Sequence, residues 1–130
     1  MKNLIKSGLF AIGVFGFNMS VANEISADFL KTELERAHAA YLTGSVDTGL
    51  YALEALARLL ESDQSAALQT EVGSNNLAFT YVRIGLLYEK TGNTSQAQAY
   101  FNKALGSYQG HKIEMASLKD SVLKLDNISS

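Results

Sequence analysis

The sequence predicts an all-α protein that forms a single domain. The chain has 130 residues, contains no Pro, and places its apolar residues at helical spacing along most of its length. A chain of this length makes one domain, and no stretch alternates apolar and polar residues well enough to predict a strand. Pro marks the turns of many β-rich folds, so its absence together with 47% apolar residues favours helices. With no Cys, the chain has no disulfide, thiol nucleophile or Cys-based metal site.

Residues 1–22 resemble a secretory signal peptide. They begin with Lys2 and Lys6, continue with an apolar run at 8–17, and end with small residues at positions 20 and 22. The run is about half as long as a membrane-spanning helix requires, so a retained anchor is only the alternative. We predict cleavage after Ala22 and a periplasmic or secreted location in a bacterium. The whole chain has a formal charge of −2, too near neutral to suggest nucleic-acid binding, and the chain after the signal peptide has about −4.

The expected single domain, 23–130, begins with a helical hairpin at 26–61. Apolar residues such as Leu30 and Leu34 recur on one face of its first half, and Leu53 and Leu60 continue the pattern in its second half. Gly44 separates the two halves as a helix-ending residue. Ser45 or Asp47 is expected to cap the second helix.

A polar connector at 62–75 leads to a second hairpin, at 76–108. Gly92 and Asn93 break this segment into two helices, and Asn93 and Gln96 have the spacing of a capping box. A fifth helix is expected at 112–126. Its apolar stripe consists of Met115, Leu118, Val122 and Leu125.

Large and small residues recur at fixed positions from Phe79 to Tyr108. The positions are Tyr81, Ile84, Gly85, Tyr88, Gly92, Asn93, Ala97, Phe101 and Ala104. This pattern resembles a tetratricopeptide repeat. The family pattern ends in Pro, whereas this chain has Gln109 and Gly110 there.

The resemblance implies a close crossing of the two helices of this repeat at Gly85 and Ala97, with Tyr88 and Phe101 filling the space on either side. A bulky residue at Gly85 would push the helices apart, so Gly85→Leu should be costly. Gly85→Ala should be mild or stabilising, because Ala favours helices.

The first hairpin, 26–61, matches the repeat less well and is interpreted as a degenerate copy. The resemblance therefore implies antiparallel hairpins stacked in a short right-handed array of the tetratricopeptide type. The helix at 112–126 would be the terminal capping helix, since a last repeat otherwise exposes an apolar face.

By family analogy, the function implied is a non-catalytic protein–protein interaction module or adaptor in the cell envelope. The first helix of each repeat lines a concave groove, and the matching positions here are Phe79, Val82, Leu86, Glu89 and Lys90. Such a groove would hold a short apolar or amphipathic segment of another protein. Alternatively, the first hairpin covers Phe79, Val82 and Leu86 completely.

Other functions have weaker support in the sequence. Glu35 and His38 have the Glu-x-x-His spacing of di-iron bundles, but the chain offers only a reversed second copy, His111 and Glu114. We therefore expect no metal, no cofactor and no catalytic residues. A small helical enzyme or metal-binding bundle is the alternative. A partner-specific immunity protein or secretion accessory is a variant of the first hypothesis. The expected partner is another protein or peptide, with no nucleic acid, and a membrane only through that partner.

Overall fold

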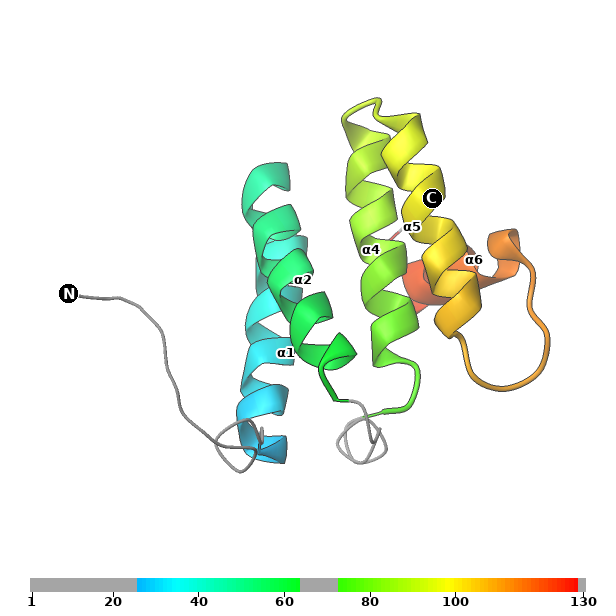
Figure 1. The fold of residues 1–130 in the computed structure, drawn as a ribbon. Coiled ribbons are helices and arrows are strands. Elements are labelled where there is room, and N and C mark those ends of the chain that lie inside the picture. The colour runs from blue at the N-terminus through cyan, green and yellow to red at the C-terminus, as the bar shows by residue number, and fades with distance from the viewer. Residues whose placement is uncertain (1–25, 64–72, 129–130) are drawn as a thin grey trace.

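The computed structural model describes residues 26–63 and 73–128, and this part of the chain is helical. No strand occurs within these two ranges, so the predicted all-α class is confirmed. The predicted signal peptide lies outside the described residues, as does the connector between 64 and 72. The helices are α1 (Ala27–Thr43), α2 (Val46–Glu61), α4 (Asn76–Lys90), α5 (Thr94–Ser107) and α6 (Met115–Leu125) (Figure 1).

Polar side chains fix where three of these helices begin. Ser26 accepts a hydrogen bond from the amide of Phe29 at 3.1 Å, and Ser45 accepts one from Thr48 at 3.1 Å. Asn93 Oδ1 accepts from the Gln96 amide at 3.2 Å and caps α5. Each cap satisfies an amide that the helix itself leaves unpaired. The choice between Ser45 and Asp47 is thereby decided for Ser45.

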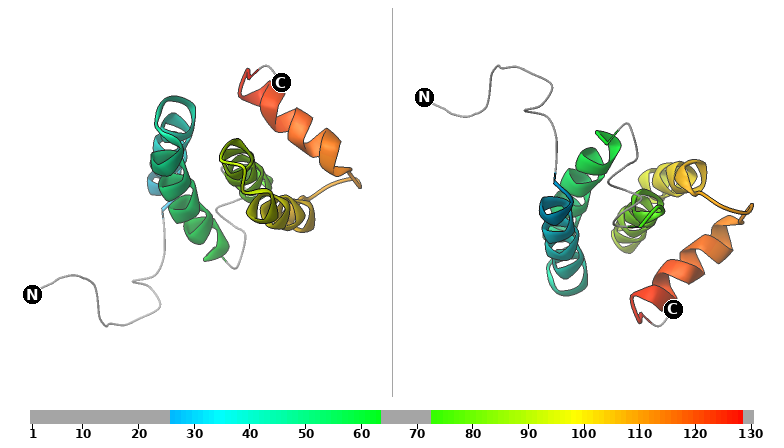
Figure 2. Two further views of the ribbon diagram at one scale, coloured as in Figure 1. Left: turned by 90° about the horizontal axis from the view of Figure 1, so that it is seen from above. Right: turned by 90° about the horizontal axis from the view of Figure 1, so that it is seen from below.

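The helices stack as two antiparallel hairpins with a crossing helix behind the second. α1 packs on α2, α2 packs on α4, and α4 packs most extensively on α5. α6 runs across α4 and α5 instead of continuing their direction (Figures 1 and 2). The largest fully buried apolar side chains of the core between these layers come from α1, α2, α4 and α6: Leu30, Leu53, Leu60, Val82, Ile84, Leu118 and Val122. The arrangement is the short helical array that the sequence predicted.

Gly85 lets the two helices of the second hairpin approach closely. Ala97, Phe101 and Ala104 of α5 are all buried against α4. A Cβ built on Gly85 would collide with the ring of Phe101, lying 2.7 Å from its Cδ1 atom. The expectation that Ala would be mild at position 85 is therefore wrong, because even a Cβ atom there requires the buried ring of Phe101 to move.

The side chain of Asn75, just before α4, bonds to the backbone at the end of the second hairpin. Its Oδ1 atom accepts a hydrogen bond from the Gln109 amide at 2.7 Å, and its Nδ2 atom donates to the Gln109 carbonyl at 3.1 Å. Gly110 has φ 127°, a conformation open to glycine. These contacts form the turn where the family pattern places Pro.

The capping helix, α6, is rotated about its own axis relative to the orientation that its apolar stripe predicted. Leu118 and Val122 are fully buried, as expected, but Leu125 is 59% exposed. The next buried position is four residues after Val122, at Asp126. The inward face of α6 thus ends in a carboxylate instead of an apolar side chain.

Candidate functional site

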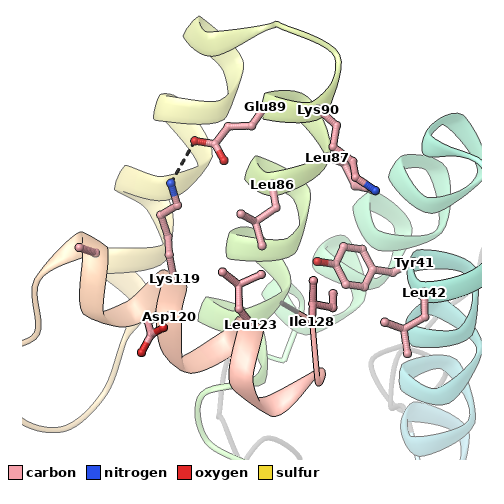
Figure 3. A pocket seen from close by; sticks show the side chains of 11 residues that line it. Tyr41, Leu42, Leu86, Leu87, Glu89, Lys90, Lys119, Asp120, Leu123 and Ile128 are labelled. Carbon is pink, nitrogen blue, oxygen red and sulfur yellow. Dashed lines mark hydrogen bonds and ion pairs between the residues drawn. The ribbon is translucent and has the colours of Figure 1, made fainter. Parts of the chain in front are cut away.

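A groove of about 810 Å³ lies between α1, α4 and α6 (Figure 3). Helices from both hairpins and the crossing helix contribute to it, together with the turn that follows α6. The lining residues are Tyr41, Leu42, Leu86, Leu87, Glu89, Lys90, Ala116, Lys119, Asp120, Leu123 and Ile128. A concave site of this size is typical of ligand and peptide binding.

The centre of the groove is apolar. Leu86 of α4, Leu123 of α6 and Ile128 point toward the same space, and the ring of Tyr41 faces them from α1 (Figure 3). Leu42 and Ile128 are exposed large apolar residues. Apolar side chains gathered in an open concavity favour the binding of an apolar partner surface.

Charged side chains surround this apolar centre. Lys119 Nζ lies 3.0 Å from Glu89 Oε2 and 4.4 Å from the centroid of the Phe101 ring. Asp120 pairs with Lys124 one helical turn later, at 3.1 Å. Within residues 26–63 and 73–128, Lys90 has no ion-pair partner. The rim therefore offers one uncompensated positive charge.

The structure brings together three of the five residues that the sequence proposed for a groove. Leu86, Glu89 and Lys90 line it. Val82 is fully buried in the core, and Phe79 is partly buried against the core, so neither lines the groove. The alternative of a completely covered surface does not apply to Leu86, which stays partly exposed.

A buried carboxylate links the three helices that form the groove. Asp126, at the end of α6, has a completely buried side chain. Its Oδ2 atom accepts from Arg83 Nε at 2.9 Å, and its Oδ1 atom accepts from Arg83 Nη2 at 2.8 Å. Oδ1 also lies 2.9 Å from His38 Nε2 of α1. Such a two-pronged pair between a guanidinium and a carboxylate is strong and directional.

The electrostatics of Asp126 follow from these contacts. Burial by itself raises the pKa of the Asp126 carboxyl, because it penalises the charged form. The hydrogen bond and charge of Arg83, with those of His38, outweigh burial and lower the pKa below its usual value. Asp126 is therefore a carboxylate at neutral pH.

The sequence did not predict the cluster of His38, Arg83 and Asp126. His38 was considered only for its spacing from Glu35, whereas the structure places it 2.9 Å from Asp126. The available signal was the i+4 spacing from Leu118 to Val122 to Asp126, which puts Asp126 on the buried face of α6. Arg83, between the buried Val82 and Ile84, gave no signal of its own.

The turn after α6 places Ile128 at the groove. Asn127 has φ 57°, the left-handed conformation common after a helix end. The Asn127 amide donates to the Lys124 carbonyl at 3.1 Å, and the Ile128 amide donates to the Leu123 carbonyl at 2.9 Å. This hydrogen-bond pair is a Schellman motif, in which the residue after the turn contacts the last turn of the helix.

Tyrosines of the second hairpin line a second, smaller hollow of about 280 Å³ beside α2. The Tyr81 hydroxyl donates to Glu61, and the Tyr88 hydroxyl donates to Glu54 at 3.0 Å. Burial and the hydrogen bond to Glu61 raise the pKa of Tyr81. The rings of Tyr88 and Tyr100 stack with centroids 5.8 Å apart. These side chains tie α2 to the repeat by packing and hydrogen bonds.

The described residues show no further chemical site. Within the ranges 26–63 and 73–128, no three His, Asp or Glu side chains are grouped so that they could hold a metal ion. In the same ranges, no helix has the length and apolar character required to cross a membrane.

Comparison with known proteins identifies one part of the chain. The sequence pattern of the tetratricopeptide repeat family matches residues 80–111, which cover most of α4 and all of α5. No curated protein and no solved structure matches the chain. One repeat is thus recognised in a TPR-like helical protein.

Proposed function

We propose, from the recognised repeat and the groove beside it, that the protein is a non-catalytic adaptor that binds a segment of another protein. Tetratricopeptide repeats are generally non-catalytic modules and commonly bind proteins or peptides. The observation that carries the proposal is the apolar groove between α1, α4 and α6, where Leu86, Leu123 and Ile128 remain accessible.

The chemistry of the groove points to an amphipathic partner segment. Its apolar side chains would cover Leu86 and Leu123, because burying such surface is the main favourable term in association. An acidic side chain on the same segment would complement Lys90, whose charge no described residue neutralises. Such a charge pair adds selectivity for one orientation of the segment.

The proposed place of action is the cell envelope. The basic start, the short apolar run and the small residues before position 23 support export to the periplasm or the medium. Under this proposal the chain meets membranes only through its partner.

The test is capture of a partner by the tagged mature protein from periplasmic extract, with the wild type and two variants compared. Leu86→Glu places a charge at the centre of the groove, and the new side chain is one turn from Lys90, which reduces the cost to the fold. Tyr51→Glu is the matched control, since Tyr51 lies on α2 and is 76% exposed. Mass spectrometry identifies the captured proteins, and circular dichroism verifies the fold.

We expect Leu86→Glu to keep its helicity and to lose the partner, while Tyr51→Glu retains both. Intact fold with intact capture in Leu86→Glu would contradict the groove as the binding site. Loss of the helical signal in Leu86→Glu would mean that position 86 belongs to the core, because an unpaired buried charge is not tolerated there.

A further inference from the structure

We propose that Asp126 is a positioning residue of the groove. By holding the end of α6 against both α1 and α4, its carboxylate sets the separation between the groove walls. This inference rests on the proposed function, since the shape of the groove matters only if the groove binds a partner.

The first argument is how little else joins α1 to α6. α1 packs mainly on α2, whereas α6 packs on α4 and α5. The two helices face each other across the groove, with Tyr41 and Leu42 on one side and Leu123 on the other. The hydrogen bond between His38 and Asp126, 2.9 Å between Nε2 and Oδ1, spans this gap directly.

The second argument is that the residues beside Asp126 and His38 are groove residues. Asn127 and Ile128 follow Asp126 in a tight turn, so a shift of the carboxylate moves Ile128 with it. The ring of His38 stacks on the ring of Tyr41, with centroids 6.5 Å apart. Both partners of this hydrogen bond are therefore coupled to side chains that line the groove.

The third argument is that position 126 carries a charged residue. Position 126 continues the buried stripe of Leu118 and Val122, a face on which helices usually carry apolar side chains. A buried ion pair is often no more stabilising than well-packed apolar residues of similar volume. The carboxylate adds directional hydrogen bonds, because Arg83 and His38 each hold it in a defined geometry.

The test measures the groove without any partner. Because the chain has no Cys of its own, spin labels attach only to the two Cys residues that are introduced by mutation. A groove pair carries labels at the exposed positions Ala39 of α1 and Ser117 of α6, and a reference pair carries them at Ala39 and at the exposed position Asn102 of α5, both outside α6. Pulsed electron paramagnetic resonance gives the distance distribution of each pair.

The informative variants are His38→Ala and Asp126→Asn, with His38→Gln as the conservative rescue. His38 has a side chain that is 39% exposed, so its replacement spares the core and leaves the pair of Arg83 and Asp126 in place. We expect the groove pair to broaden and move to longer distances in His38→Ala and Asp126→Asn, with the reference pair unchanged. His38→Gln, whose amide can donate to Asp126, should restore the wild-type distribution.

Two outcomes overturn the proposal. One is an unchanged groove pair in His38→Ala, which would show that the hydrogen bond between His38 and Asp126 does not hold α6 in place. The other is equal broadening of both pairs, which would show general loosening of the fold. Should Asp126→Asn fail to fold, His38→Ala decides the matter alone. Because no partner is present, the outcome is independent of whether Leu86→Glu abolishes capture.

Discussion

Gly85 lies directly against the ring of Phe101, and this contact fixes how closely α4 and α5 approach. A side chain of any size at position 85 would meet the ring of Phe101, which is itself buried. The small residue is needed for packing, since Gly in a helix interior otherwise costs stability relative to Ala.

Substitutions at Gly85 should be destabilising in order of size. We expect Gly85→Ala to lower the free energy of unfolding by about 1–3 kcal/mol through overpacking, and Gly85→Leu to lower it further. Gly106→Ala is the control, because no atom lies within 4 Å of a Cβ built there. That change should leave stability unchanged or raise it by up to about 1 kcal/mol. Urea titrations followed by circular dichroism measure all three, and equal effects of Ala and Leu at position 85 would contradict the close contact.

The contribution of Asp126 to stability should depend on pH. Its folded pKa lies below the unfolded value, so the carboxylate stabilises the fold above about pH 4 and loses that effect as the pH falls through the folded pKa. At pH 7, Asp126→Asn removes the charge that compensates the buried Arg83, a loss of about 3–5 kcal/mol.

The difference in unfolding free energy between wild type and Asp126→Asn should therefore shrink as the pH is lowered below about 4. Asp120→Asn serves as the control, since Asp120 is an exposed carboxylate on the same helix. Its effect should stay below about 1 kcal/mol at neutral pH. A pH-independent difference for Asp126→Asn would show that the charge of Asp126 contributes nothing.

The effect of replacing Asn127 on stability should depend on how easily the new residue adopts the left-handed backbone conformation. Asn127→Gly should preserve or raise the melting temperature, because Gly adopts this conformation freely. Asn127→Val should cost about 1–2 kcal/mol, since the left-handed conformation is strained for a β-branched residue. Thermal melts of the two variants provide the measurement. Similar melting temperatures would mean that the turn after α6 adds little to the fold.

The proposed export can be tested on protein recovered from the producing cell. We expect N-terminal sequencing to begin at Asn23, one residue after the predicted cleavage position. Ala22→Leu should leave an uncleaved precursor, because a signal peptidase requires a small residue there. Recovery of the wild type with Met1 intact would contradict export by cleavage.

The sequence predicted the helices well because their signals are local. Ser45 and Asn93 cap helices where the spacing placed them, and Gly85, Ala97 and Phe101 pack as the repeat pattern implied. Each of these signals depends on residues within a few turns of one another, so one sequence is enough to read them.

The groove was predicted only in part because it depends on how distant helices are oriented. Leu86, Glu89 and Lys90 were found from the repeat, but Leu123 and Ile128 reach the groove only because α6 crosses behind α4. The end of α6 carries Asp126, whose contact His38 lies 88 positions away in the chain. An apolar stripe favoured Leu125 as the inward residue, and no local pattern reports that a buried Arg83 would stabilise a carboxylate instead.

The pair of His38 and Asp126 also changes how the array should unfold. In a linear helical array each unit contacts only its neighbours, so the end helices can melt independently. Here the first helix is bonded to the last one across the intervening hairpin. Fraying of α6 would break a contact of α1 at the same time, so we expect the two helices to unfold together. We expect the amide hydrogens of α1 and α6 to exchange with similar protection, a behaviour closer to that of a globular domain than to that of an open array.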